Sequence, residues 1–126
     1  MEVFKIRVRI KGHLKNTEER EYFEIDVIGI KNKNKITYNE NNIKNTIYIN
    51  NDELILIREN DEFKNILNFI ENKKTVTSYL LKESNTEIEL NIKTESLLIS
   101  DNSIEIVYMI IETDNIYEYK IEVSDY

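Results

Sequence analysis

The chain has 126 residues, no cysteine, one histidine and a formal net charge of −7 at pH 7. Its length fits one domain over residues 1–126, while the missing cysteines exclude disulfides and thiolate metal sites, and His13 alone cannot build a histidine-based zinc site. The negative charge argues against nucleic acid as the main partner, because phosphate binding needs a surplus of lysine and arginine.

The first predicted elements are two strands, over residues 4–11 and 22–27, in which apolar and charged residues alternate from Phe4 onward. A period of two indicates a sheet with one buried face. A two-residue turn at Asn16 and Thr17 would place Ile10 opposite Phe23. The same turn predicts the pairs Val8–Ile25, Ile6–Val27, Arg9–Glu24, Arg7–Asp26 and Lys15–Glu18. Lys5, Arg7, Arg9 and Lys11 form a basic stripe on the other face of the first strand. Because carboxylates would face these cations, we interpret the stripe as paired charge rather than as a phosphate-binding surface.

Clusters of asparagine and aspartate then divide the chain into short strands. An asparagine-rich stretch over residues 32–45 is predicted to form loops around a strand at residues 35–40. A turn at Asn51 and Asp52 would set Ile49 against Leu54, and likewise Ile47 against Leu56. With two glycines in the chain, asparagine is the next-best residue for the positive-φ positions of tight turns.

Residues 62–71 fit two structures. Phe63, Ile66, Leu67 and Ile70 are spaced as on an amphipathic helix, and Asp61 could cap its N-terminus. The same residues also permit a strand, but the local pattern favours a short helix.

The last predicted hairpin has its turn at Asp114 and Asn115. This turn predicts the pairs Ile110–Tyr119, Tyr108–Ile121 and Ile106–Val123. On the opposite face of the first of these strands, Val107, Met109 and Ile111 are also apolar. We expect these three side chains to point outward, where they could form an interface or be covered by another part of the chain.

Many short strands at a spacing of about 8–12 residues indicate an all-β antiparallel sandwich or barrel. The order of several landmarks resembles the YwiB-like family of bacterial proteins. The landmarks are Tyr38 and Glu40; Thr46 and Ile47 before residues 54–58; Leu67 and Phe69 before Thr75 and Tyr79; residues 89–94; residues 104–108; and Tyr119, Lys120 and Ile121. The resemblance implies a single up-and-down calycin-like barrel of about 8–10 strands, in which residues 62–71 form a strand. The family has no established activity, so the resemblance carries over no functional residue.

Arg58 is the first candidate for a ligand contact. It has the same inward parity as Leu54 and Leu56, which would place its guanidinium near one mouth of the barrel, where it could bind a carboxylate or phosphate. The alternative is an ion pair with a rim carboxylate, Glu40 or Glu112. The further candidates are Tyr38, Tyr79, Tyr108 and Tyr119, whose hydroxyls could point into a cavity or serve only packing.

The chain lacks a glycine-rich phosphate loop, a cysteine nucleophile and a serine in a nucleophile-elbow motif. We interpret His13 as a solvated loop residue beside the first turn rather than as a base. We therefore expect a small-ligand-binding module without catalytic activity and without a cofactor. The alternative is a protein-interaction module that uses Val107, Met109 and Ile111.

Composition points to an AT-rich bacterial genome, and we expect a cytoplasmic monomer or weak homodimer that contacts neither nucleic acid nor membrane.

Overall fold

The computed structural model describes residues 5–17 and 21–126, which contain ten β-strands and no helix. The strands are β1 (Ile6–Asn16), β2 (Glu21–Asn32), β3 (Lys35–Glu40), β4 (Ile43–Asn50), β5 (Glu53–Glu59), β6 (Phe63–Ile70), β7 (Lys74–Leu81), β8 (Thr86–Ile99), β9 (Ser103–Ile110) and β10 (Asn115–Asp125). Each strand pairs antiparallel with its neighbours in sequence, and β1 pairs with β10 to close a barrel. The predicted all-β class and up-and-down antiparallel barrel are confirmed. The predicted positions of Phe4 and of the Lys15–Glu18 pair fall outside the described residues.

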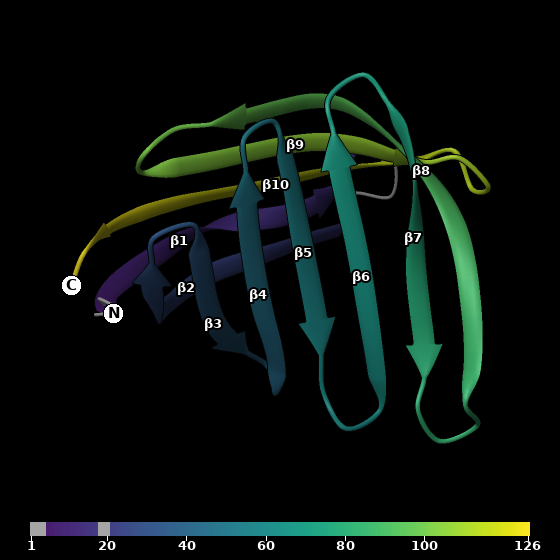
Figure 1. The fold of residues 1–126 in the computed structure, drawn as a ribbon, viewed down its shortest axis with the longest axis horizontal. Helices are drawn as coiled ribbons and strands as arrows, with labels where there is room; N and C mark the ends of the chain where they lie inside the picture. Colours follow the sequence, from purple (N-terminus) through teal and green to yellow (C-terminus); the bar gives the residue numbers. More distant parts are fainter. Residues whose placement is uncertain (1–4, 18–20) are drawn as a thin grey trace.

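The barrel has two walls whose strands cross. In Figure 1, β4 to β6 lie in front and run steeply across β9 and β10 behind them. The long strand β8 joins the walls, because it pairs with β7 over residues 86–93 and with β9 over residues 92–99. A register shift between Thr94 and Ser96 interrupts the second ladder, and irregularities of this kind bend a strand. None of the described segments forms a helix of the length and apolar character that a membrane crossing requires.

Apolar side chains fill one half of the barrel interior. Every second residue of each strand points inward, so the inward residues of opposite walls meet. The apolar side chains that are more than 98% buried are Ile10, Ile47, Leu54, Phe69, Ile92, Ile104, Ile106 and Ile121. These residues belong to one core, which continues through Tyr38, Tyr108 and Tyr119 toward the turns after β3 and β5. At that end, which is the open half of the barrel, polar side chains also line the interior.

The first hairpin has a different register from the predicted one. Ile10 lies opposite Val27 instead of Phe23, a shift of four residues, because β1 continues to Asn16 and four residues separate it from β2. An even shift keeps each side chain on its face, so Ile10 and Ile25 are still buried. Phe23, however, is 53% exposed near the barrel mouth, and the predicted pairs of this hairpin are wrong.

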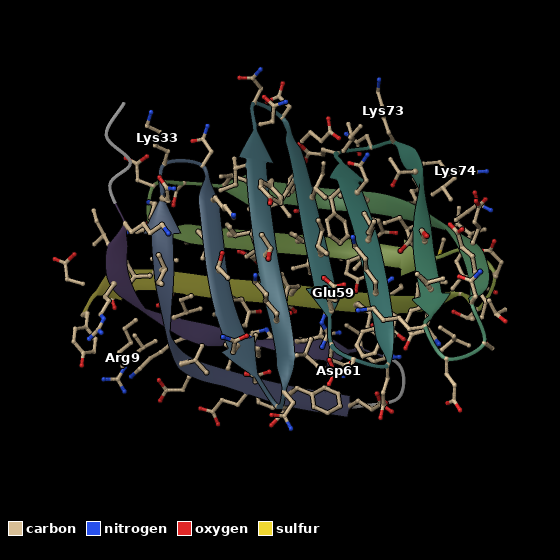
Figure 2. The ribbon with its side chains drawn as sticks, turned by 60° about the horizontal axis from the view of Figure 1, so that its bottom comes forward. Arg9, Lys33, Glu59, Asp61, Lys73 and Lys74 are labelled. Atoms are coloured by element: carbon tan, nitrogen blue, oxygen red, sulfur yellow. The ribbon has the colours of Figure 1, made fainter. Side chains whose placement is uncertain are left out.

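The shifted register also changes the charge pairs on the outer surface. Arg9 contacts Asp26 diagonally, with its Nε 3.3 Å from Oδ1, and Figure 2 shows Arg9 pointing away from the barrel. The Lys15 ammonium lies 3.1 Å from the carboxylate of Glu118 on β10. His13 lies within β1, with its Nε2 3.4 Å from the same carboxylate, so its predicted place in a loop is wrong. Arg9 of the basic stripe thus has a carboxylate partner on β2. The carboxylate beside Lys15 and His13 comes from β10 instead.

The middle hairpin has the predicted register, and the last one does not. Ile49 lies opposite Leu54 across the turn at Asn51 and Asp52. In contrast, Tyr119 lies opposite Ile106 instead of Ile110, again a shift of four residues. The turn between β9 and β10 takes up residues 111–114, so Ile111 belongs to a turn rather than to a strand.

Residues 62–71 form a strand, and the predicted helix is wrong. β6 (Phe63–Ile70) pairs with β5 over residues 64–70, and Leu67 and Phe69 are buried on the inward face. The helical spacing of the apolar residues is therefore overridden by pairing with β5, as the resemblance implied.

Asparagine serves the tight turns as predicted. Asn41, Asn42 and Asn51 have positive φ angles, as do Asn72 and Asn85, whereas neither glycine does. Gly29 is needed for a different reason. A Cβ atom there would collide with the side chain of Ile10 and the backbone of the neighbouring strand β3.

Candidate functional site

The open half of the barrel contains a cavity of about 270 Å³. It lies at the end of the barrel where β3 turns into β4, and its wall combines polar and apolar side chains. The lining residues are Leu14, Phe23, Ile25, Tyr38, Glu40, Asn41, Ile43, Asn45, Leu56, Arg58, Asn65, Leu67, Tyr108 and Tyr119. A concave, mainly apolar wall with a few convergent polar groups is typical of a small-molecule site.

Strand register places three polar side chains side by side at the cavity. Asn45 of β4 lies opposite Arg58 of β5, which in turn lies opposite Asn65 of β6. The Arg58 Nε donates a hydrogen bond of 3.1 Å to the side-chain oxygen of Asn45. Because this bond uses only Nε, the terminal nitrogens of the guanidinium keep their N–H groups for another partner.

Two tyrosines meet across the interior. The hydroxyls of Tyr38 on β3 and Tyr119 on β10 lie 2.7 Å apart, and both side chains are buried. Burial raises the pKa of Tyr38 to about 12 and raises that of Tyr119 well above its usual value. Both hydroxyls therefore keep their protons at neutral pH. One donates to the other, so the accepting hydroxyl can still donate its own proton to a third group.

Tyr108 adds a hydroxyl without a protein partner. Its side chain is 93% buried and packs against Tyr117, with ring centroids 5.4 Å apart. Among the described residues, none forms a hydrogen bond with the Tyr108 hydroxyl. Burial raises its pKa, so this hydroxyl also stays protonated. This hydroxyl faces the cavity, so a bound molecule could accept a hydrogen bond from it.

Arg58 and Glu40 line the same cavity without forming an ion pair. Burial raises the pKa of the Glu40 carboxyl, and the positive charge of Arg58 partly opposes this rise. Glu112, the other expected partner of Arg58, instead accepts hydrogen bonds from the backbone and side chain of Asn91, at 2.8 and 2.9 Å. The predicted alternative of a rim ion pair for Arg58 is therefore not found among the described residues.

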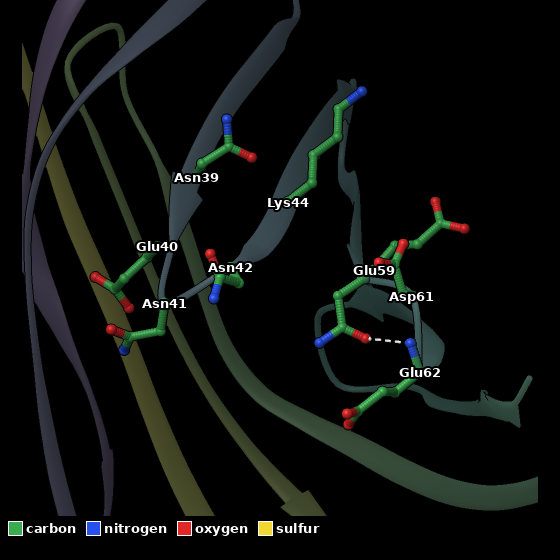
Figure 3. Close-up of a pocket in the computed structure, with 9 residues that line it drawn as sticks. Asn39, Glu40, Asn41, Asn42, Lys44, Glu59, Asp61 and Glu62 are labelled. Carbon is green, nitrogen blue, oxygen red and sulfur yellow. Dashed lines mark hydrogen bonds between the residues drawn. The ribbon is translucent and has the colours of Figure 1, made fainter.

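A second hollow, of about 750 Å³, adjoins the cavity on the rim. The turn after β3 and the segment between β5 and β6 form its sides (Figure 3). Its charged lining residues are Glu40, Lys44, Glu59, Asp61 and Glu62. Glu40 and Asn41 line both the hollow and the cavity, so the acidic rim leads to the interior site.

Four of the five predicted ligand contacts lie together. Tyr38, Arg58, Tyr108 and Tyr119 all line the cavity. Tyr79 does not, because its ring stacks on Phe63 with centroids 5.3 Å apart and planes 6° apart.

Sequence reasoning missed most of the remaining wall. Asn45 could have been found, since the register of β4 and β5 was predicted and sets this residue opposite Arg58. Asn65 could not, because β6 was expected to be a helix. Leu14 and Phe23 were missed because they come together only in the observed register of the first hairpin.

The predicted outer strip is only partly exposed. Val107 and Met109 point outward from β9 and are half-buried, while Ile111 is half-buried in the turn that follows. The neighbouring Leu98 on β8 is 58% exposed. Within residues 5–17 and 21–126 no cluster of three or more acidic or histidine side chains is arranged to hold a metal ion.

Comparison with known proteins places this site on a shared fold. The family model described as a domain of unknown function, DUF1934, matches residues 8–123. The crystal structure of the ywiB protein from Bacillus subtilis is similar, with a TM-score of 0.71 and 17% sequence identity over 98% of this chain and 93% of that chain. At this identity, the likeness concerns the fold. No curated protein matches the chain.

Proposed function

The chain belongs to the DUF1934 family, and on that premise we propose that it is a calycin-like barrel that binds a small molecule with an anionic group, without catalysing a reaction. The observation that carries this proposal is the set of unused hydrogen-bond donors in one cavity. The Arg58 terminal nitrogens, the Tyr108 hydroxyl and one hydroxyl of the Tyr38–Tyr119 pair lack protein acceptors among the described residues. A carboxylate supplies acceptors for all of them.

The apolar part of the wall limits the ligand further. Leu14, Ile25 and Leu67 line the cavity beside the donors, so the ligand should have an apolar portion next to its anionic group. The volume of about 270 Å³ lies at the lower end of the range for small-molecule sites. The proposed ligand is therefore a small organic acid rather than a long lipid.

The experiment is calorimetric titration with 3-phenylpropanoate at pH 7. We expect binding to the natural protein and a loss of about tenfold to hundredfold in affinity for Arg58→Met, because a hydrogen bond to a charged group contributes about 1.5–3 kcal/mol. Arg9→Met is the matched control, since Arg9 is exposed on the outside of β1. Its affinity should equal that of the natural protein. Equal losses in the two variants would contradict the proposal, and so would an absence of binding by both 3-phenylpropanoate and L-phenylalanine.

A protein-interaction module is the second candidate, and the exposure of Leu98 beside the outer strip favours it. In that case Leu98, Val107 and Met109 would contact a second protein, and self-association is the simplest form. Sedimentation velocity across a wide concentration range tests this. A weak dimer that Leu98→Lys abolishes supports an interface, whereas a monomer at all concentrations opposes self-association through this face.

Two related proposals follow from the sequence rather than from the cavity. The absence of cysteine fits a reducing compartment, so we propose a cytoplasmic location. The net charge of −7 supports the proposal that neither nucleic acid nor an anionic membrane surface is a partner.

A further inference from the structure

We propose that the ligand of this cavity is a zwitterion of the size of a free amino acid with an apolar side chain. This inference rests on the proposed function and names its ligand class. A simple organic acid could neutralise only the cation of the cavity and would leave its carboxylate without a positive partner. The cavity holds one cation, Arg58, and one carboxylate, Glu40, and no ion pair joins them.

The anionic group of the ligand is assigned to the Arg58 side of the cavity. The guanidinium offers a planar pair of N–H groups, and the Tyr108 hydroxyl offers a donor on a side chain that is more than nine-tenths buried. Both groups line the cavity and have donors that no described residue accepts from, so a carboxylate here could accept charge-assisted and neutral hydrogen bonds from them together.

The cationic group is assigned to the Glu40 side. A simple carboxylate on Arg58 would place a second negative charge near Glu40, which is unfavourable in a partly buried site. An ammonium beside Glu40 removes this repulsion and supplies the carboxylate with a hydrogen-bond donor. Asn41 lines the cavity as well, and its side-chain oxygen can accept a further N–H group.

The electrostatics of the entrance provide a separate argument. The rim hollow that meets the cavity at Glu40 is also lined by Asp61, Glu62, Glu59 and a single cation, Lys44. Glu59 is paired with Lys82 at 2.9 Å, so Asp61 and Glu62 supply most of the remaining negative charge. Figure 2 shows Asp61 at the opposite end of the barrel from Lys33 and Lys73. An acidic entrance disfavours the approach of an anion but admits a molecule that also has a positive group.

One side of the cavity is apolar and could contact the apolar side chain of such a ligand. Leu14, Phe23 and Ile25 come from β1 and β2, on the far side of the interior from the strand that holds Arg58. Phe23 is 53% exposed. Contact with an apolar ligand side chain would remove part of this surface from water.

The test compares three probes that share one aromatic ring. They are L-phenylalanine, 3-phenylpropanoate, which lacks the amine, and 2-phenylethylamine, which lacks the carboxylate. By calorimetry at pH 7, we expect L-phenylalanine to bind at least about tenfold more tightly than either single-charge probe, because each of these leaves one charged side chain unpaired. In Glu40→Gln, the advantage over 3-phenylpropanoate should fall below about threefold, since the amide no longer repels the acid.

Glu122→Gln is the matched control, because Glu122 is exposed on β10 and lines neither the cavity nor the rim hollow. It should leave the preference for L-phenylalanine within about twofold of the natural value. A melting curve for each variant confirms that it is folded.

The outcomes separate the two proposals. Tighter binding of 3-phenylpropanoate than of L-phenylalanine, with dependence on Arg58, would overturn the zwitterion and leave the proposed function standing. Binding of neither carboxylate would overturn both. A preference for L-phenylalanine that survives Glu40→Gln would also overturn the role assigned to Glu40.

Discussion

At the scale of single residues, the cavity depends on side chains that burial holds in one protonation state. Tyr38, Tyr108 and Tyr119 all have raised pKa values, and desolvation is the largest cause for each. A neutral hydroxyl can donate to an anion, whereas an ionised one would repel it. The positive charge of Arg58 opposes the rise in all three tyrosines, so its field reaches every hydroxyl of the cavity.

The raised pKa of Tyr38 predicts how stability changes at high pH. In the unfolded chain a tyrosine ionises near pH 10, while in the folded protein Tyr38 does so near pH 12. The unfolded chain therefore binds fewer protons between these values, and the free energy of unfolding falls as pH rises from about 10 to about 12. The contribution is fully present below pH 10 and is lost at up to about 1.4 kcal/mol per pH unit.

Urea unfolding between pH 9 and pH 12 measures this effect. Tyr38→Phe should show a shallower fall than the natural protein, because one ionising group is removed. Tyr22→Phe is the control, since Tyr22 is 59% exposed on the outside of β2, and it should keep the full slope. Identical slopes for the natural protein and Tyr38→Phe would rule out the raised pKa.

At the scale of the elements, the junction between β6 and β7 has a backbone ladder over only part of the two strands. Backbone pairing of these strands stops at Ile66 and Ser78. Beyond this point Thr75 and Thr77 donate from their side chains to backbone carbonyls of β6. Hydrogen bonds from these side chains replace the missing backbone pairs between β6 and β7. Asn65, which lines the cavity, also lies on β6.

From the hydrogen bonds at this junction we predict how Thr77→Val changes the free energy of unfolding. Thr77 is buried, donates to the Ile66 carbonyl at 2.8 Å and accepts from the Asn65 side chain at 3.2 Å. Thr77→Val keeps the shape but removes the hydroxyl from both partners, so we expect a loss of about 1–3 kcal/mol in the free energy of unfolding. Urea unfolding at pH 7 measures it. Thr37→Val on β3 is the control and should change stability by less than about 0.5 kcal/mol. Equal values for the two variants would show that the threonine bridge is not stabilising.

The strands and their inward faces could largely be predicted from the alternation of apolar and polar residues. The register of β4 and β5 could be predicted too, because Asn51 and Asp52 form a two-residue turn between them. The registers of the first and last hairpins were wrong by four residues, since alternation is satisfied equally by every even shift. A pattern with a period of two therefore predicts which face is buried but not where a long hairpin turns.

The residues of the candidate site could be predicted only where the strand and its register were predicted correctly. Arg58 was predicted at the mouth from its parity with Leu56, and its opposite residue Asn45 follows from the correct register of β4 and β5. Asn65 and Phe23 could not be placed, since one lies on the strand that resembled a helix and the other on the hairpin with the wrong register. Which inward residues surround a cavity depends on how all ten strands close, and local patterns do not contain that information.

At the scale of the whole molecule, the barrel is divided between a packed half and an open half. The packed half contains the large buried side chains such as Phe69, and the ladder between β1 and β10 closes the wall around it. In the open half, the hydroxyls of Tyr38 and Tyr119 are joined across the interior. A preformed site loses little entropy on binding, which suits a small ligand with few contacts.

The most direct test of the ligand site is a ¹H–¹⁵N NMR titration of the natural protein with 3-phenylpropanoate at pH 7, which also detects weak binding. We expect saturable shifts of the Arg58 Nε–H signal and of the backbone amides of Tyr38, Tyr108 and Tyr119, which line the cavity. Signals of the outer strip at Val107 and Met109 should move less. Shifts confined to that strip, or no saturable shift at Arg58, would contradict a ligand site in the barrel interior.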